Sequence, residues 1–246
     1  MSQPWIRADW PAAEQIIAGT TLRDGGASSG KFRSFNLADH VGDDPVAVAD
    51  NRARLQELAG IHGEPLWLRQ VHGCIALRNP EPGTQREADA AYSNRPGDTC
   101  VVLTADCLPV LFASRDAGEI AAAHAGWRGL CSGILEATAS HFDAPAAEIM
   151  AWLGPGISRD AFEVGEEVRQ AFLDADSQAV KCFQQNERGR WQADLYALAR
   201  QRLAACGITA VYGGNYCTFS NSSRFFSYRR DGECGRMASF ISLNPA

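Results

Sequence analysis

The strongest constraint on the fold is a pair of apolar runs joined by a short polar segment. Residues 99–112 are apolar and rich in β-branched side chains, and residues 119–124 form a second short apolar run. The segment between them, residues 114–118 (Ser-Arg-Asp-Ala-Gly), carries turn-forming residues, so the pattern predicts a β-hairpin. Because Pro109 has no backbone N–H, we expect its part of the first strand to lie at a sheet edge or a bulge.

The register of this hairpin decides which polar side chains meet. If the turn is centred near Asp116, the residue numbers of two paired positions add up to between 231 and 233. Cys107 then faces position 124, 125 or 126. The first of these registers puts Cys107 across from His124, with Cβ atoms about 4.5–5.5 Å apart. That separation suits a thiolate and an imidazole that share a hydrogen bond or a metal. A packed core cysteine beside a structural histidine is an equally good interpretation of these residues alone.

A third candidate ligand lies where a predicted strand runs into a glycine turn. His72 is part of the segment Gln-Val-His-Gly at residues 70–73, and it precedes Cys107 by 35 residues, while His124 follows Cys107 by 17. Two imidazoles and one thiolate would leave a fourth zinc position open for water or substrate, which is typical of a catalytic zinc. The spacing by itself carries little weight. His72, Cys107 and His124 are therefore the candidate catalytic and metal-binding residues.

Along the rest of the chain, helices and strands alternate without a regular βαβ rhythm. We expect helices at residues 50–58 and 125–142 and strands at residues 149–153 and 237–243. This order favours an α+β fold, a mixed-sheet αβ sandwich, over a doubly wound sheet. Without repeats or a long linker, residues 1–246 are predicted to form a single domain. Further expected elements are strands at 66–71, 208–212 and 225–228 and helices at 166–172 and 194–207, the last capped by Asp194 and closed by Gly207.

Composition limits the partners and the compartment. The 246 residues carry a net charge of −6, which argues against general binding to nucleic acid or anionic membranes. The amino terminus lacks the apolar stretch of a signal peptide, and no apolar run reaches the ~18–20 residues of a membrane span. We therefore expect a cytoplasmic protein with reduced thiols. None of the eight cysteines forms a Cys-x-x-Cys pair, so zinc ribbons and thioredoxin-type sites lack their usual signature.

Blocks of residues spread over nearly the whole chain resemble the YfiH family. This family is also called the laccase-domain or polyphenol oxidase family and, more recently, the purine nucleoside phosphorylase family. The resemblance implies a mixed αβ sandwich, which is also similar to the deamidase domain of cytotoxic necrotising factor. The main blocks are residues 70–73 (QVHG), 104–110 (TADCLPV), 123–129 (AHAGWRG) and 154–157 (GPGI), with further blocks at 20–26, 34–43, 51–55, 217–218 and 225–230.

The resemblance also implies an activity. It suggests a catalytic zinc held by His72, Cys107 and His124, and phosphorolysis of adenosine, inosine and S-methyl-5′-thioadenosine, with adenosine deamination as a companion reaction. The expected partners are thus small molecules, a purine nucleoside and phosphate, and both a monomer and a homodimer stay open. Deamination needs a nucleophilic water, whose pKa a bound zinc lowers to about 7.

Phosphate should be held by arginine, whose planar fork suits an oxyanion. Arg52 is the first choice because it follows the loops at residues 34–43, although a solvated or ion-paired surface role competes for every candidate. The predicted substrate-binding residues are Asn36, Arg52 and Arg229, and the other arginines considered are Arg23, Arg128 and Arg230.

Several neighbouring residues have two interpretations. Asp89 and Asp106 are candidates to orient a ligand imidazole, against an ordinary role as turn carboxylates. Trp127 is a candidate to stack on a purine, against a packing role. His40 belongs either to a brace within its loop or to the rim of the site.

Two other functions compete with phosphorolysis. A copper-dependent polyphenol oxidase is compatible with two histidines and a cysteine, because such a set also binds copper. A laccase mechanism, however, needs a further copper cluster with many more histidines, and the chain has only five. The second competing function is that of a hydrolase that edits peptidoglycan precursors. In such an enzyme Cys107 would act without metal, as a nucleophile activated by His124.

Overall fold

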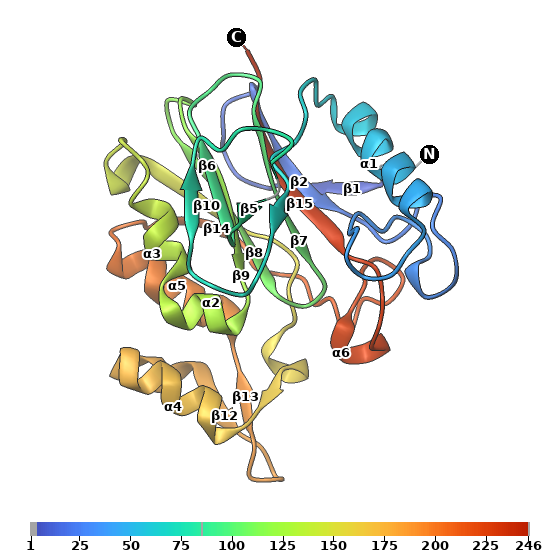
Figure 1. The fold of residues 1–246 in the computed structure, drawn as a ribbon. Coiled ribbons are helices and arrows are strands. Elements are labelled where there is room, and N and C mark those ends of the chain that lie inside the picture. Colours follow the sequence, from blue (N-terminus) through green and yellow to red (C-terminus); the bar gives the residue numbers. More distant parts are fainter. Residues whose placement is uncertain (1–3, 85, 246) are drawn as a thin grey trace.

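Two stacked sheets form the centre of the computed structural model, which describes residues 4–84 and 86–245 (Figure 1). The smaller sheet runs in the order β1 (Trp5–Arg7), β2 (Ile16–Thr21), β15 (Met237–Leu243), β7 (Thr99–Thr104). The larger runs in the order β14 (Ala210–Gly213), β10 (Ile149–Leu153), β8 (Leu108–Ser114), β9 (Ile120–Ala125), β6 (Ala90–Ser93), β4 (Ala76–Arg78).

The two sheets pack face to face over a shared apolar core. Val102 and Ile241 from the smaller sheet meet Leu111 and Trp152 from the larger one in the same buried cluster. Every residue of β8 and β9 is buried, because helices cover the outer face of the larger sheet. Strands buried on both faces need apolar residues at every position, which is why these strands read as continuous apolar runs.

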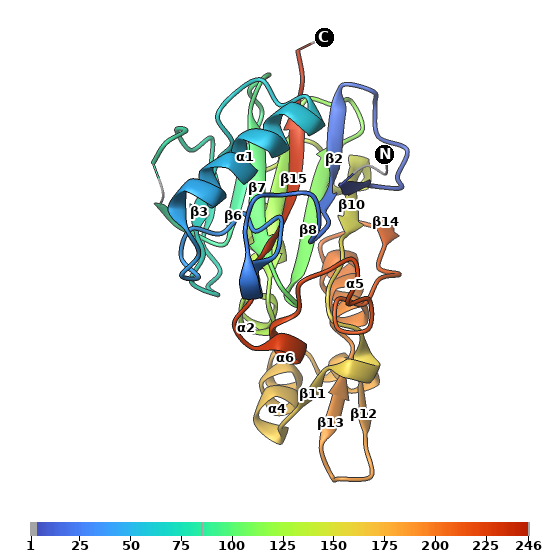
Figure 2. The same cartoon turned by 90° about the vertical axis from the view of Figure 1, so that its right-hand side faces the viewer.

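Helices close both outer faces, so the molecule has four layers. α1 (Pro45–Ala59) covers the smaller sheet through Leu55, and Figure 2 looks onto this helix with β7 and β15 behind it. The larger sheet is covered by α2 (Trp127–Ser132), α3 (Ile134–Ala139) and α5 (Leu195–Ala205). This arrangement confirms the expected mixed αβ sandwich.

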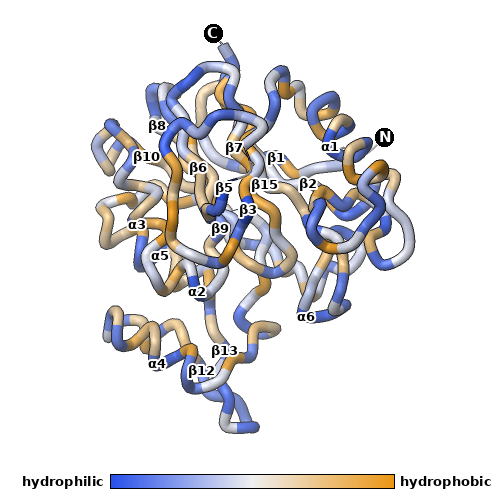
Figure 3. The backbone as a smooth tube through the Cα atoms, in the orientation of Figure 1, coloured by the Kyte–Doolittle hydropathy of each residue, from blue (hydrophilic) through white to orange (hydrophobic). Residues whose placement is uncertain are grey.

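A smaller group of elements projects below the sandwich (Figure 1). It consists of α4 (Glu166–Ala175) and a small sheet in the order β11 (Glu163–Val164), β13 (Trp191–Ala193), β12 (Phe183–Gln185). The tip of the hairpin between β12 and β13 is hydrophilic (Figure 3). The remaining elements are β3 (Leu68–Arg69), β5 (Arg86–Glu87), α6 (Tyr228–Asp231) and 3₁₀ turns at Gly30–Phe32, Ala146–Glu148, Arg159–Ala161 and Ser177–Cys182.

Across residues 4–84 and 86–245, every helix is too short or too polar to span a bilayer.

The apolar run at residues 99–112 is not one strand, which corrects the sequence interpretation. It breaks between β7 and β8, and the two halves join different sheets. Asp106 makes the break with a positive φ of 88°. The residues before and after Asp106 are apolar because both sheets are buried. A hydropathy pattern therefore cannot show that a turn separates the two strands.

The expected edge or bulge at Pro109 is also wrong. β8 lies between β9 and β10, and Pro109 pairs regularly with His124. The Pro109 carbonyl accepts a hydrogen bond from Gly154 N–H at 2.9 Å. The N and O atoms of a residue in such a strand face the same side, so the missing N–H would face Gly154 O, which accepts a hydrogen bond from the Tyr196 hydroxyl at 3.1 Å instead.

The hairpin register differs from the one that would pair Cys107 with His124. Leu108 pairs with Ala125, so paired positions sum to 233, the far limit of the predicted range. Cys107 therefore lies just outside the strand, level with Gly126. The expected strand at residues 225–228 is also wrong, since Tyr228 begins α6. The expected helix at residues 125–142 begins at Trp127 and is broken at Gly133, which has a φ of 96°.

Other elements agree closely with the sequence. β10 and β15 have the predicted bounds, and the Asp194 side chain caps α5 by accepting a hydrogen bond from Ala197 N–H. α1 begins earlier than predicted, because Asp44 caps it and Pro45 occupies its first position, where a missing N–H costs nothing.

Candidate metal centre

The structure brings His72, Cys107 and His124 together at one end of the sandwich. Their ligand atoms all lie within 4.8 Å of one another, and the two imidazole rings meet edge to face with centroids 4.8 Å apart. His72 follows β3, Cys107 lies in the turn between β7 and β8, and His124 lies near the end of β9. The donor set of two imidazoles and a thiolate fits a zinc ion with one open position, and it also fits copper.

Two of the residues that shape this site adopt a backbone conformation that is unusual for residues other than glycine. His72 has a φ of 60° and Asp106 a φ of 88°. Such positions cost energy and persist only where surrounding contacts fix them. They turn the chain sharply at the points where the ligands His72 and Cys107 must face each other.

A buried carboxylate holds both histidine ligands. Asp89 Oδ1 accepts hydrogen bonds from His124 Nδ1 at 2.8 Å and from the His72 backbone N–H at 2.9 Å, and Oδ2 accepts one from Gly73 N–H at 2.7 Å. A carboxylate can only accept, so the proton of His124 lies on Nδ1, and Nε2 is the free ligand atom. Asp89 thus orients the His124 imidazole, as considered from the sequence, while the metal-binding role of that imidazole stays a prediction.

Strand pairing explains why Asp89 reaches His124. Ala90 pairs with Ala123 in the β6–β9 ladder, so Asp89 and His124 are the next pair along the two strands. Burial opposes the charge of Asp89, but the hydrogen bonds from His124 and from the Gly73 and Val71 amides outweigh it and lower the pKa of Asp89. The carboxylate therefore stays ionised in the core.

Electrostatics within the trio favour a thiolate. Burial alone would raise the pKa of Cys107, but the charge and hydrogen bonds of His124 and His72 lower it instead. Burial likewise opposes a charged His124, whereas the Cys107 thiolate and the Asp89 carboxylate raise the pKa of that imidazole. The pair thus holds a proton between a thiolate and an imidazole, which are the forms that bind a metal once the proton leaves.

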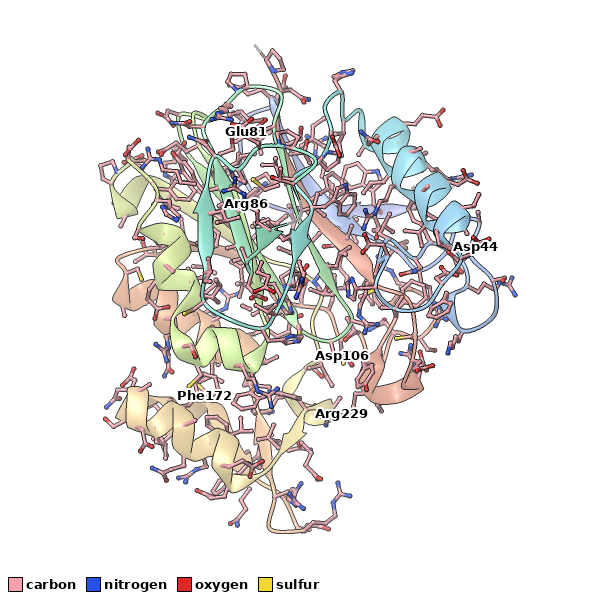
Figure 4. The ribbon with its side chains drawn as sticks, in the orientation of Figure 1. Asp44, Glu81, Arg86, Asp106, Phe172 and Arg229 are labelled. Carbon is pink, nitrogen blue, oxygen red and sulfur yellow. The ribbon has the colours of Figure 1, made fainter. Side chains whose placement is uncertain are left out.

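Of the two roles considered for Asp106, the structure shows the turn carboxylate and, within residues 4–84 and 86–245, no contact with a histidine of the trio. Its carboxylate accepts hydrogen bonds from Thr218 Oγ1 at 2.6 Å, Ser227 Oγ at 3.0 Å and Arg229 N–H at 2.7 Å. It thereby ties the start of α6 to the turn that carries Cys107. Figure 4 shows Asp106 and Arg229 at this lower end of the sheets.

A cavity of about 410 Å³ opens onto the three ligands. A volume of this size suits a small molecule. Gln70 forms part of the cavity wall. Its side chain is held in place by the Leu103 backbone, since it accepts a hydrogen bond from Leu103 N–H at 2.7 Å and donates one to Leu103 O at 2.9 Å. The lining residues are His40, Gln70, His72, Leu103, Thr104, Ala105, Cys107, His124, Tyr228 and Arg236, which places His40 at the rim.

The predicted substrate-binding residues lie outside this lining. Asn36 is buried, and its side chain bonds to Ala38, Asp43 and the Arg236 backbone. Arg52 donates to Leu37 O, pairs with Asp39 at 3.3 Å and stacks on Trp67. Arg229 donates to Glu163 O and lies over the Phe162 ring. Of the other arginines considered, Arg23 donates to Ser222 O, Arg128 stacks on Trp127 and Arg230 pairs with Asp231.

Arg236 is the charged cavity residue that sequence reasoning did not single out, and Thr104 and Tyr228 were also not predicted. Arg236 directly precedes β15, whose first residue, Met237, pairs with Thr104 at the end of β7. Cys107 follows Thr104 by three residues, so this pairing brings Arg236 beside the Cys107 turn. The β7–β15 pairing joins distant parts of the chain, and only a correct prediction of it could have indicated Arg236.

Gly126 leaves the space in which the ligands meet. A Cβ atom there would lie 2.9 Å from Cys107 Sγ, 3.3 Å from His72 Cδ2 and 3.5 Å from His124 Nε2. We predict that Gly126→Ala weakens metal binding by at least about tenfold, because the methyl group displaces the ligands. Competition with a chelator measures this. Gly118→Ala is the control, because its Cβ meets only ordinary contacts with Asp116, and equal metal affinity in both variants would contradict the prediction.

Asp89→Asn tests the buried carboxylate. Whichever way the amide turns, its NH₂ group faces N–H donors that Asp89 now accepts, so at least about 2 kcal/mol of unfolding free energy should be lost. Metal affinity should fall about 10–100-fold as His124 loses its fixed tautomer. Chemical denaturation and metal titration measure the two effects. Asp160→Asn, an exposed carboxylate beside Arg159, should change neither, and an Asp89→Asn protein with normal metal affinity would refute this role.

Known sequences match nearly the whole chain. The family described as "Multi-copper polyphenol oxidoreductase laccase" matches residues 17–244. A purine nucleoside phosphorylase of Pseudomonas aeruginosa is 49% identical over 240 residues, which cover 97% of this chain and 98% of that protein. The purine nucleoside phosphorylase YfiH of Escherichia coli is 50% identical over 239 residues, again covering 97% of this chain and 98% of the relative.

Solved structures share the whole fold. The crystal structure of a Neisseria meningitidis protein has a TM-score of 0.95 and 45% identity, covering 98% of this chain and 100% of that one. The structure of YlmD from Geobacillus stearothermophilus has a TM-score of 0.90 and 30% identity, covering 100% of this chain and 98% of that one. With its sequence matched from end to end and its fold shared throughout, the chain belongs to the YfiH family, also described as the multi-copper polyphenol oxidoreductase laccase family.

Proposed function

We propose that this protein is a zinc-dependent purine nucleoside phosphorylase that cleaves adenosine, inosine and S-methyl-5′-thioadenosine. The observation that carries the proposal is the set His72, Cys107 and His124 at the base of a cavity that also holds Arg236. A metal-binding set, a space for a small molecule and a permanent cation are the parts that this reaction needs. Relatives about half identical to this chain bear the name of the same activity.

The reaction exchanges one bond at the sugar. A phosphate oxygen forms a bond to C1′ of the ribose, while the bond from C1′ to the purine nitrogen breaks. The electron pair of that bond goes to the base, which takes the proton that the attacking hydrogen phosphate loses, and the products are the free base and ribose 1-phosphate. When bound, zinc would act as a Lewis acid that polarises an oxygen or activates a water.

The residues of the chain contribute binding, orientation and protection from water. Asp89 fixes the His124 ring, so that Nε2 faces Cys107 at the base of the cavity. Apolar atoms of Leu103 and Ala105 line the wall and limit the water that would otherwise hydrolyse the nucleoside. Tyr228 is 58% exposed, and the Arg236 guanidinium lies 5.7 Å from its ring centroid, so the opposite face of the ring is the one on which a purine can stack.

Adenosine deamination belongs to the same proposal. Water would add at the purine carbon that bears the amino group, and ammonia would leave, giving inosine. Unlike phosphorolysis, deamination needs an activated water. A zinc ion held by three protein ligands would leave its fourth position open for this water. Substrate and metal would therefore occupy the same cavity in both reactions.

A multicopper oxidase mechanism fits the chain less well. His72 and His124 belong to the trio, whereas His62 is exposed and His141 bonds to Ala76 O at 3.0 Å. Across residues 4–84 and 86–245, no second group of three or more such ligands is present. A single site with two histidines and one cysteine cannot supply the several copper ions of a laccase, although it could still bind one copper ion.

The proposal is tested with protein purified without added metal. Mass spectrometry should find about one zinc per chain, and inosine with phosphate should yield hypoxanthine and ribose 1-phosphate in equal amounts. Cys107→Ala should lower kcat/KM by more than about 100-fold, because it removes a metal ligand. Cys74→Ala removes an exposed thiol outside the cavity lining and should retain full activity.

Three results would count against this function. Cleavage that proceeds without phosphate and yields free ribose would indicate a hydrolase. Activity that survives metal removal but disappears in Cys107→Ala would favour the metal-free cysteine nucleophile, including one acting on peptidoglycan precursors. Intense blue absorbance with oxidation of phenols would indicate copper chemistry instead.

A further inference from the structure

Arg236 is the one permanent cation in the cavity lining described above. A guanidinium stays charged at any physiological pH. The side chain is half-buried, and its residue follows Gly235, whose position allows no side chain. A Cβ atom on Gly235 would lie 2.6 Å from Phe226 Cζ and 2.9 Å from Asn36 Cβ, so close packing fixes the chain at this point.

The backbone and one end of Arg236 are held in place. Asn36 Oδ1 accepts a hydrogen bond from Arg236 N–H at 2.9 Å, and Leu37 N–H donates to Arg236 O at 3.2 Å. Nη1 donates to the carbonyls of Cys234 at 2.7 Å and Gly235 at 3.1 Å. The guanidinium is thus oriented before any ligand binds, which lowers the entropy cost of binding.

The Nε and Nη2 donors on the other edge of the Arg236 guanidinium are available to a ligand. Within residues 4–84 and 86–245, Nε and Nη2 of Arg236 have no hydrogen-bond partner and no carboxylate within ion-pair distance. Nearby arginines differ, since Arg52 pairs with Asp39 and Arg230 with Asp231. The Nε–Nη2 edge is the fork that binds two oxygens of one oxyanion. A half-buried cation that lacks a counter-charge is therefore suited to an anionic ligand.

A second polar group in the same lining also lacks a partner. Thr104 is 1% exposed, and in the described part of the chain its hydroxyl forms no hydrogen bond. Buried hydroxyls are rarely left unsatisfied in folded proteins, so a ligand in the cavity is the natural partner. Thr104 lies next to Arg236 in space, because it pairs with Met237 across the sheet.

We propose that Arg236 and Thr104 form the subsite for the tetrahedral oxyanion, which is inorganic phosphate in the forward reaction. This inference rests on the proposed phosphorolysis and assigns one substrate of it to named residues. It replaces Arg52 and Arg229 as the expected phosphate ligands, since both use their guanidinium groups elsewhere. Sulfate and arsenate share the charge and shape of phosphate and should compete for the same edge.

The kinetic test separates the two substrates. Arg236→Gln should raise the KM for phosphate about 10–100-fold and change the KM for inosine less than about threefold, because it removes a charged, two-bonded contact to the anion. Thr104→Val keeps the side-chain shape and should raise the phosphate KM about 2–10-fold. Arg188→Gln loses the same charge at the exposed tip of the β12–β13 hairpin and should change neither KM.

Equal increases in both KM values, or an unchanged phosphate KM, would overturn the assignment. Arg236→Lys keeps the charge without the fork and should give an intermediate phosphate KM. If circular dichroism shows that Arg236→Gln does not fold, the test uses Arg236→Lys and Thr104→Val instead. Each of these variants should raise the phosphate KM and leave the inosine KM nearly unchanged.

Direct binding separates this inference from the proposed function. Zinc-loaded wild-type protein is titrated with inorganic phosphate by calorimetry, whether or not it cleaves nucleosides. Phosphate binding that Arg236→Gln weakens at least tenfold supports the subsite even if no phosphorolysis is found. Binding that Arg236→Gln leaves unchanged places phosphate elsewhere, such as on the metal, and refutes the inference while the phosphorylase activity can still stand.

Discussion

The candidate metal centre depends on one buried negative charge. Asp89 is fully buried and accepts hydrogen bonds from His124 Nδ1 and from the backbone N–H groups of His72, Gly73 and Val71. Burying a carboxylate costs several kcal/mol unless such donors compensate it. Here the compensating donors belong to the two histidine ligands and their neighbours, so the same bonds that stabilise the charge also set the distance between the ligands.

The surrounding layers bring the required chain segments to one place. β7 ends and β8 begins at the turn that carries Cys107, β9 ends just beyond His124, and β15 begins just after Arg236. Because neighbouring antiparallel strands alternate in direction, strand ends and strand starts meet at one edge of the sandwich. Asp106 then ties the Cys107 turn to the start of α6, whose first residue, Tyr228, forms part of the cavity wall.

The sequence could predict the parts of the site that local chemistry and motif blocks determine. The ligand trio, the role of Asp89 and the bounds of β10 and β15 are examples. The hairpin register was predicted only as a range of three, because the turn residues at 114–118 do not fix which positions of the two strands pair. The split between β7 and β8 was concealed by burial on both faces, and Arg236 depends on pairing between residues more than a hundred positions apart. These features are set by tertiary contacts, which no local pattern encodes.

The most direct test of the account is X-ray absorption spectroscopy at the zinc edge on protein purified with its metal. The proposed ligands predict one sulfur at about 2.3 Å and two imidazole nitrogens at about 2.0–2.1 Å, with a lighter atom completing the coordination. The sulfur contribution should disappear in Cys107→Ala. A zinc environment without sulfur, or with more than one, would contradict the assignment of His72, Cys107 and His124 as the metal-binding set.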